Sequence, residues 1–286
     1  MARYSQPDKK RKALSTMGIF LLAAALLSFI AFYVIVMISQ QGYHYIDPDT
    51  LELVQIQDIP DGAPTAVIET SLGEIRAVLY PEYAPNTVSQ FISLAEKGWY
   101  NDTCIFEAKN NVYFAAGSAD SSGTLKTPPV FENQEKVPQE LHQNLWPFRG
   151  ALCALTTSTD TSFSKRLFKN ETYYTGSRFM LLNSVDFSDE EFVTQFREAS
   201  GSELLADTFL NLGGVPNFSQ QITVFGQAYS GLDVISQITS LPLAEDANQQ
   251  GYTPPLEEIK ILSVTISSYS QEDAVLNELT SLPVTD

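Results

Sequence analysis

The residue types that most often bind metals or act as nucleophiles are scarce in this sequence. Cysteine occurs only as Cys104 and Cys153, and histidine only as His44 and His142. The histidines stand alone and no metal-ligand spacing is present, so we expect no metal site and no cofactor. Both cysteines lie in apolar stretches, where one disulfide and two buried free thiols remain open alternatives.

Charge is distributed unevenly along the 286 residues, whose net charge is −17. Residues 1–16 carry five bases and one acid, and removing them leaves 12 Lys+Arg against 33 Asp+Glu, a net charge of −21. Such a surface repels nucleic acid and anionic headgroups, so we expect no nucleic-acid partner. Self-repulsion that keeps the domain dispersed is one interpretation, and a preference for basic clients is the other.

The basic segment 1–16 precedes an uncharged run, residues 17–38, "MGIFLLAAALLSFIAFYVIVMI". At about 1.5 Å per residue this run spans roughly 33 Å as a helix, against about 30 Å of bilayer hydrocarbon. No A-x-A pattern follows Ile38, which favours an uncleaved anchor over a cleaved signal peptide. The bases indicate a cytoplasmic N-terminus. The sequence therefore predicts a single-pass membrane protein with its domain extracytoplasmic, at the cell surface.

The chain beyond this anchor divides by composition. Residues 39–63 mix Gly, Pro and acids and are typical of a stalk. Residues 269–286 are polar and acidic and are typical of a tail. The segment between them, 64–268, carries the apolar patterning of a folded domain.

Within that domain, "TAVIETSLGEIRAVLY" predicts strand, turn and strand, with Gly73 at the turn. "APNTVSQFISLAEKGWY" predicts a helix that begins near Pro85 and ends at Gly98. A second helix is expected in "SGLDVISQITSL". Five further β-prone runs, the first of them 105–116, favour a mainly β antiparallel barrel or sandwich with a helix near each end.

One segment, about 186–214, has the character of a helical insertion. Ser188 and Glu191 form a capping box, with Phe187 and Phe192 placed as its hydrophobic staple. A second short helix is expected from Ser202, ending before the next glycine pair. The insertion is either decoration on the barrel rim or a lid over a groove.

Two motifs carry a family resemblance, "VIETSLGEIRAVLYPEYAPNTVSQFISLAEKGWYND" and "TVFGQAYSGLDVISQI". Together with "GGVPNFSQQITVFG" they resemble the cyclophilin-type peptidyl-prolyl isomerases over residues 64–268. The resemblance implies a closed eight-stranded antiparallel barrel capped by two helices, with a shallow peptide groove on its outer face. Its implied partners are proline-containing segments of secreted or surface proteins, whose folding it would assist.

The resemblance also identifies a departure at the reaction centre. Rotation about an X–Pro bond faces a barrier of about 18–20 kcal/mol, which the family lowers with an arginine aimed at the proline nitrogen. Aligned from Gly98, that arginine falls on Glu107, or on Ala108 with a one-residue slip. Losing one such donor costs about 10²- to 10³-fold in rate. We therefore expect weak or lost catalysis, and no residue is assigned as catalytic with certainty.

Arg178 stands where the family has a groove glutamine. It is either a substitute cation that reaches the proline nitrogen or a surface arginine paired with an acid. The remaining apolar candidates form either a proline pocket or ordinary barrel core. The complete set that the resemblance assigns to the peptide groove is Tyr113, Ala115, Arg178, Phe179, Met180 and Phe218.

Three functions remain open on this basis. The first is a membrane-anchored isomerase with modest activity. The second is a non-catalytic binder or chaperone for proline-containing segments, and the third is a scaffold in a cell-envelope assembly.

Overall fold

The structure is a computed structural model that describes residues 18, 21, 27–33, 50–118, 120–123, 137–158 and 173–270. The chain forms two compact units, one of 1–45 with 162–170 and one of 46–161 with 171–286. Described residues of the first unit are helical and exposed. Among the described residues no helix has the length and apolar character needed to cross a membrane. Most of the predicted anchor, residues 17–38, lies outside the described residues, as do 1–16 and 271–286.

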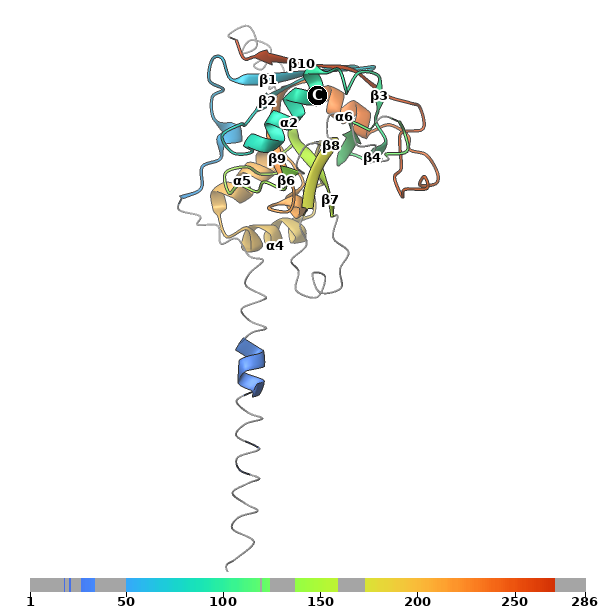
Figure 1. The fold of residues 1–286 in the computed structure, drawn as a ribbon. Coiled ribbons are helices and arrows are strands. Elements are labelled where there is room, and N and C mark those ends of the chain that lie inside the picture. The colour runs from blue at the N-terminus through green and yellow to red at the C-terminus, as the bar shows by residue number, and fades with distance from the viewer. Residues whose placement is uncertain are drawn as a thin grey trace, which may run out of the picture. The chain divides into compact units, whose positions relative to one another are not determined.

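The described strands of the second unit form one antiparallel sheet of ten strands (Figure 1). Their order is β3-β10-β1-β2-β9-β7-β8-β5-β4, and β6 pairs with β8 outside this path. The bounds are β1 (Pro64–Thr70), β2 (Gly73–Leu79), β3 (Thr103–Cys104), β4 (Glu107–Lys109), β5 (Tyr113–Ala116), β6 (Val137–Pro138), β7 (Ala151–Ser158), β8 (Tyr173–Leu182), β9 (Thr223–Ser230) and β10 (Lys260–Ser268).

The sheet curls because consecutive residues pair with its two ends. β3 and β4 stand at opposite ends of the strand order, yet only Ile105 and Phe106 separate them along the chain. The N–H of Ile105 donates to the carbonyl of Ile259 at 2.9 Å, and that of Phe106 donates to the carbonyl of Ala115 at 3.1 Å. The described strands number ten rather than the predicted eight because this segment is divided into β3 and β4, and because the two-residue β6 is added.

The β1–β2 hairpin follows from a local turn at Gly73. The hydroxyl of Thr70 donates to the Gly73 carbonyl at 2.7 Å and accepts from the N–H of Leu72 at 3.1 Å. Gly73 has a φ of 146°, and a Cβ there would lie 2.7 Å from a methyl carbon of Val234. Glycine therefore makes the turn, as the sequence predicts, and also lets the helix Leu232–Thr239, which carries Val234, approach the hairpin.

Helix α2 (Pro85–Glu96) begins with proline in its first turn and is followed by Gly98, with a φ of 67°. Its first N–H groups are capped from elsewhere in the chain, because the Glu140 carboxylate accepts from the N–H of Asn86 at 3.2 Å and of Thr87 at 2.8 Å. A carboxylate at a helix N-terminus also complements the helix dipole. The predicted helix is confirmed, and the structure adds its cap.

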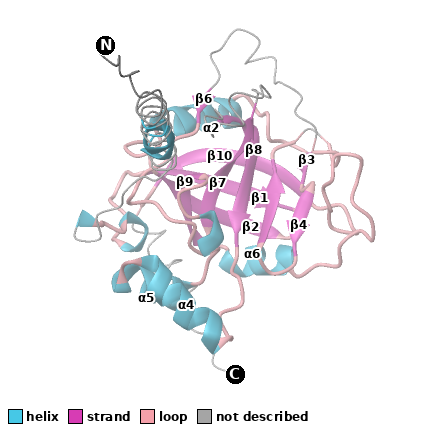
Figure 2. Ribbon diagram, turned by 90° about the horizontal axis from the view of Figure 1, so that it is seen from below, coloured by secondary structure: helices cyan, strands magenta, loops and turns pink. Residues whose placement is uncertain are grey.

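Helix α6 (Leu232–Thr239) and helix α2 lie at the two opposite openings of the curled sheet (Figure 2). Ile235 and Ile238 of α6 are fully buried. They join Phe91 of α2 and sheet residues such as Phe114 and Phe225 in the largest apolar cluster, which we call the main core.

Helices α4 (Glu190–Ser200) and α5 (Glu203–Leu212) form the expected helix pair (Figure 1). The cap of α4 differs from the prediction by one residue, because Asp189 rather than Ser188 accepts from the N–H of Glu191 at 2.9 Å. The staple contact is confirmed, since the rings of Phe187 and Phe192 lie 5.8 Å apart. Gly201 follows α4 in the left-handed conformation.

Residues of the predicted stalk also pack on the second unit. The 3-10 turn η2 (Val54–Ile56) follows Leu53, which is only 3% exposed. Leu53 joins a third apolar cluster with Trp146, Phe148 and residues of α5. Residues 51–57, which we call the strap, therefore contribute to the packing of this unit.

Candidate functional site

The curled sheet has two apolar faces, and strand alternation decides which side chain lies on which. In β8, Phe179 and Leu181 belong to the main core, whereas Met180 belongs to a separate cluster. In β5, Phe114 belongs to the main core and Ala115 to that same separate cluster. We call this side the second face, defined by the buried residues Phe106, Ala115, Leu145, Ala151, Cys153, Met180, Leu182, Val215 and Val224.

Glu107 and Ala108, the two alternatives for the family's arginine position, point to opposite sides. Ala108 is 3% exposed and belongs to the main core. Glu107 is half-buried and stands opposite Ala115 in the β4–β5 register, so its side chain is directed to the second face. The gap-free alignment therefore puts the family's arginine position on the second face, and the slipped alignment puts it in the main core.

The carboxylate of Glu107 holds one neighbouring side chain. The hydroxyl of Tyr113 donates to its Oε1 at 2.9 Å. Burial, followed by the negative charge of Glu107, raises the pKa of Tyr113 above its usual value. The phenol therefore stays protonated and remains a hydrogen-bond donor.

Arg178 is buried, with 6% of its surface exposed, rather than lying on the molecular surface. Its Nη1 donates to the carbonyl of Gly123 at 2.9 Å and to the hydroxyl of Tyr252 at 2.7 Å. The guanidinium carbon lies 5.8 Å from the ring centroids of both Phe106 and Tyr252. Two aromatic faces at this distance stabilise a cation. The guanidinium is thus enclosed by its own chain.

The other groove candidates divide between the two faces. Tyr113 and Phe218, whose rings lie 5.9 Å apart, are half-buried and pack on the second face with Ala115 and Met180. Phe179 is 1% exposed and lies in the main core. Its ring makes edge contacts with Phe91 and Tyr100 at 5.7 and 5.5 Å. The second face therefore brings together Glu107, Tyr113, Ala115, Met180 and Phe218, but not Phe179.

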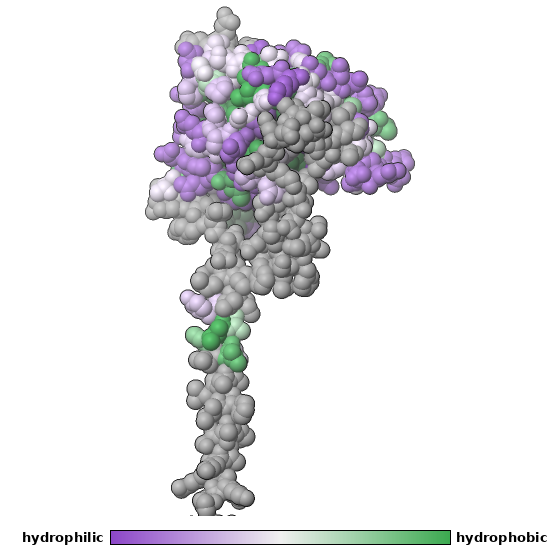
Figure 3. All heavy atoms as spheres, in the orientation of Figure 1, coloured by the Kyte–Doolittle hydropathy of each residue, from purple (hydrophilic) through white to green (hydrophobic). Residues whose placement is uncertain are grey.

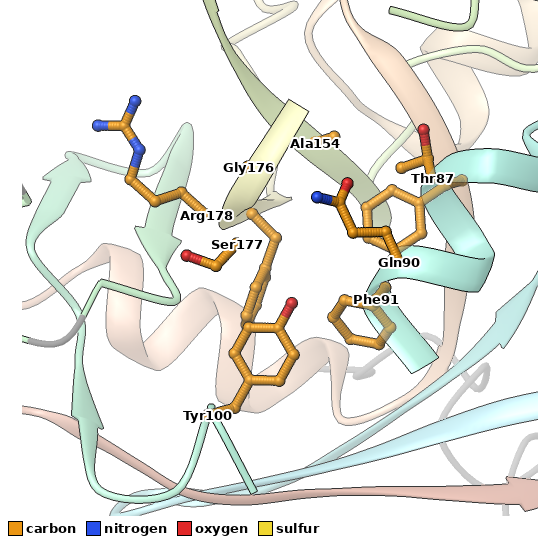
Figure 4. A pocket seen from close by; sticks show the side chains of 10 residues that line it. Thr87, Gln90, Phe91, Tyr100, Ala154, Gly176, Ser177 and Arg178 are labelled. Atoms are coloured by element: carbon orange, nitrogen blue, oxygen red, sulfur yellow. The ribbon is translucent and has the colours of Figure 1, made fainter. Parts of the chain in front are cut away.

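A small pocket lies beside α2, on the opposite side of β8 from the Arg178 guanidinium (Figure 4). Gln90 of α2 and the hydroxyl end of Tyr100 face it, and Gln90 accepts a hydrogen bond from Thr175 at 3.0 Å. Ser177 donates to the Gly117 carbonyl at 2.9 Å. Gln90 and Ser177 are thus already hydrogen-bonded to residues outside the lining, and the guanidinium of Arg178, which is itself a lining residue, extends away from the pocket.

Sequence reasoning missed Phe106 and Tyr252 as the partners of Arg178. Tyr252 lies in the loop between α6 and β10, and its position on the second face depends on pairing between Ala108 N–H and the Thr253 carbonyl at 3.0 Å. No local pattern around Tyr252 signals that contact.

The cysteines are separate free thiols in this structure. Cys104 pairs with Lys260 across β3–β10, whereas Cys153 pairs with Met180 across β7–β8. Burial raises the pKa of both thiols above the usual value. Within the described ranges no group of three or more His, Cys, Asp or Glu is arranged to hold a metal ion.

Comparison with known proteins identifies related sequences over most of this unit. The family model described as "Cyclophilin type peptidyl-prolyl cis-trans isomerase/CLD" matches residues 65–266. A protein of Staphylococcus saprophyticus named as a peptidyl-prolyl cis-trans isomerase is 23% identical over 200 residues, which cover 70% of this chain and 90% of the relative. A protein of the same name from Staphylococcus aureus strain USA300 is 20% identical over 210 residues, 73% and 95% of the two chains.

A solved cyclophilin-type isomerase of Cryptosporidium parvum superposes with a TM-score of 0.49 at 17% identity, covering 73% of this chain and 99% of that one.

Proposed function

Because the chain belongs to the cyclophilin-type peptidyl-prolyl cis-trans isomerase family, we propose that it binds proline-containing segments of secreted or surface proteins on the second face, with weak or lost catalysis. Family membership supports isomerase function in general. The reduction of catalysis rests on one observation, which is that Glu107 occupies the second face at the position where the resemblance implies arginine.

The physical reason lies in the charge that develops during rotation. As the prolyl amide twists, conjugation is lost and the nitrogen acquires a lone pair that a cationic donor stabilises. A carboxylate offers no proton to that lone pair and repels it. Arg178, the alternative cation, already donates to Gly123 and Tyr252, lies beside two aromatic rings and is only 6% exposed. Its enclosure favours a structural role over a catalytic one.

The wider architecture enters the proposal as well. With β3 and β4 counted as one interrupted strand and β6 set aside, the sheet would correspond to the family's closed eight-stranded barrel. The chain is proposed to be held at the outer side of a membrane by residues 17–38. The apolar, exposed side chains of the helical residues 27–33 support that proposal.

An isomerase assay on the full-length chain in neutral detergent tests the catalytic part. We expect kcat/KM on a proline tetrapeptide to lie at least about 100-fold below that of an arginine-containing cyclophilin measured alongside. Glu107→Arg should raise the rate about tenfold or more, because it restores a donor on the same face. Glu107→Gln is the matched control that removes the negative charge without adding a cationic donor.

A wild-type rate within tenfold of the reference cyclophilin would overturn the proposal. If Arg178→Lys then abolished that rate while leaving the circular dichroism spectrum unchanged, the donor role would pass to Arg178.

A non-catalytic binder is the second candidate, and the half-buried aromatic side chains favour it. Tyr113 and Phe218 present rings on the second face beside Met180. Such a surface can hold a proline ring by apolar contact without any donor. Binding with no rate enhancement in the assay above would support this function.

A further inference from the structure

Glu107 is a carboxylate that its own chain leaves incompletely neutralised. Its Oε1 accepts from the Tyr113 hydroxyl. Among the described residues, no lysine or arginine forms an ion pair with it and its Oε2 accepts no hydrogen bond. Lys109 is the nearest base along β4, but it is exposed and makes no such pair. A half-buried carboxylate in this state gains from a cation that arrives with a ligand.

The surroundings of Glu107 are apolar and aromatic. Tyr113 and Phe218 lie 5.9 Å apart on the second face, with Val112 and Ile222 also half-buried there. An aromatic surface of this kind suits a proline ring or the methylene stem of a long side chain. The carboxylate and the rings together fit a segment that is apolar at one residue and positive at the next.

The positive charge of Arg178 does not compete for Glu107. Its Nη1 donates to the Gly123 carbonyl and to the hydroxyl of Tyr252, and its guanidinium lies beside the rings of Phe106 and Tyr252. Outside residues 1–16 the chain carries a net charge of −21, so its long-range field attracts cationic segments as well. Local and long-range electrostatics therefore favour the same class of ligand.

We propose that the second face selects proline-containing segments that carry lysine or arginine next to the proline, with Glu107 as the specificity-determining residue. This inference rests on the proposed function, because it assumes that proline segments bind on the second face. It goes further by naming the charge of the bound segment.

The test uses fluorescence anisotropy of labelled peptides with the full-length chain in neutral detergent at physiological salt. Three peptides differ only in the residue before proline, which is lysine, norleucine or glutamate. A fourth carries lysine but has alanine in place of proline. We expect the lysine peptide to bind about threefold to tenfold more tightly than the norleucine peptide, and the glutamate peptide to bind more weakly still.

Glu107→Gln should remove the preference for lysine while preserving binding of the norleucine peptide, because glutamine can still accept from Tyr113. Glu69→Gln is the matched control, since Glu69 lies exposed on β1 and its carboxylate accepts from Ser263. It removes one charge elsewhere and should leave the preference intact.

The outcomes separate the two proposals. If the alanine peptide binds as tightly as its proline counterpart, or if no peptide binds, the proposed function fails and this inference fails with it. If proline peptides bind equally well whatever precedes the proline, only the inference fails. A lysine preference that survives Glu107→Gln also overturns it, because the preference would then come from net charge alone.

Discussion

Arg178 replaces a groove glutamine of the family with a charge, and its neighbours determine what that charge does. Its guanidinium donates to Gly123 and Tyr252, which lie in two different loops, and its central carbon lies 5.8 Å from the ring centroids of both Phe106 and Tyr252. A planar cation with several donors can serve both loops and both rings at once. We therefore interpret Arg178 as the residue that ties these loops to the second face.

The stability of the Arg178→Lys variant tests this interpretation. Lysine keeps the charge but loses the planar guanidinium and its fixed pair of donors, so we expect a loss of about 1–3 kcal/mol in the free energy of unfolding. Urea unfolding followed by the fluorescence of Trp99 and Trp146 measures it. Arg197→Lys is the control, because the Arg197–Asp207 pair is exposed and should change stability by less than about 0.5 kcal/mol. Equal effects of the two substitutions would contradict the interpretation.

At the scale of elements, the strap packs on the second unit although its composition is typical of a stalk. The Gln55 amide accepts from the Trp146 N–H at 2.6 Å and donates to the Trp146 carbonyl and to Gln227, both at 2.8 Å. Glu52 N–H donates to Asn144 at 3.1 Å. These bonds join the strap to two separate parts of the unit. The strap is therefore held to the second unit by hydrogen bonds as well as by apolar packing.

Substitutions within the strap test whether its packing stabilises the domain. Leu53→Ala should lower the free energy of unfolding by about 2–4 kcal/mol, because it leaves a cavity beside Trp146 and Phe148. Ile56→Ala, three residues away, removes a side chain that is 49% exposed and should cost less than about 1 kcal/mol. Differential scanning calorimetry would compare the two variants. Similar small losses would mean that the strap adds little to the stability of the domain.

Elements that the local sequence predicts depend on residues close together in the chain. Elements that it does not predict depend on contacts between residues far apart in the chain. The turn at Gly73, the start of α2 at Pro85 and the end of α2 before Gly98 depend on residues a few positions apart, and each is present. The strap and the enclosure of Arg178 depend on hydrogen bonds that span 91 and 74 residues. No window of sequence contains both partners, so the pattern cannot reveal them.

The candidate site illustrates the same limit at a finer scale. Sequence alone leaves Glu107 and Ala108 as alternatives, because a slip of one residue in the alignment moves the family's arginine position from one to the other. The pairing of β4 with β5 directs the two side chains to opposite faces, since alternate residues of a strand point to opposite sides. The sequence could thus predict some of the residues of the second face, but not the face of the sheet on which each side chain lies.

At the scale of the whole molecule, two opposed properties meet in one chain. The described face of the second unit is largely hydrophilic, whereas the helical segment 27–33 is apolar (Figure 3). Leu27, Phe29 and Phe32 are each about two-thirds exposed within the chain. Apolar side chains left in water cost free energy that burial in hydrocarbon recovers. The acidic remainder of the chain is repelled by anionic headgroups, so the proposed attachment to a membrane depends on residues 17–38.

Deletion of residues 1–38 tests the proposed membrane anchor. We expect the full-length chain to stay with the membrane fraction after washing at high pH, which strips proteins held by charge, and the shortened chain to leave it completely. Protease added outside intact cells should degrade the domain of the full-length chain if the basic segment 1–16 stays cytoplasmic. Recovery of the full-length chain in the soluble fraction would contradict the anchor, and protection of the domain in intact cells would reverse its orientation. Because the domain itself has no attraction for an anionic surface, partial retention of the shortened chain would instead indicate a membrane-bound protein partner.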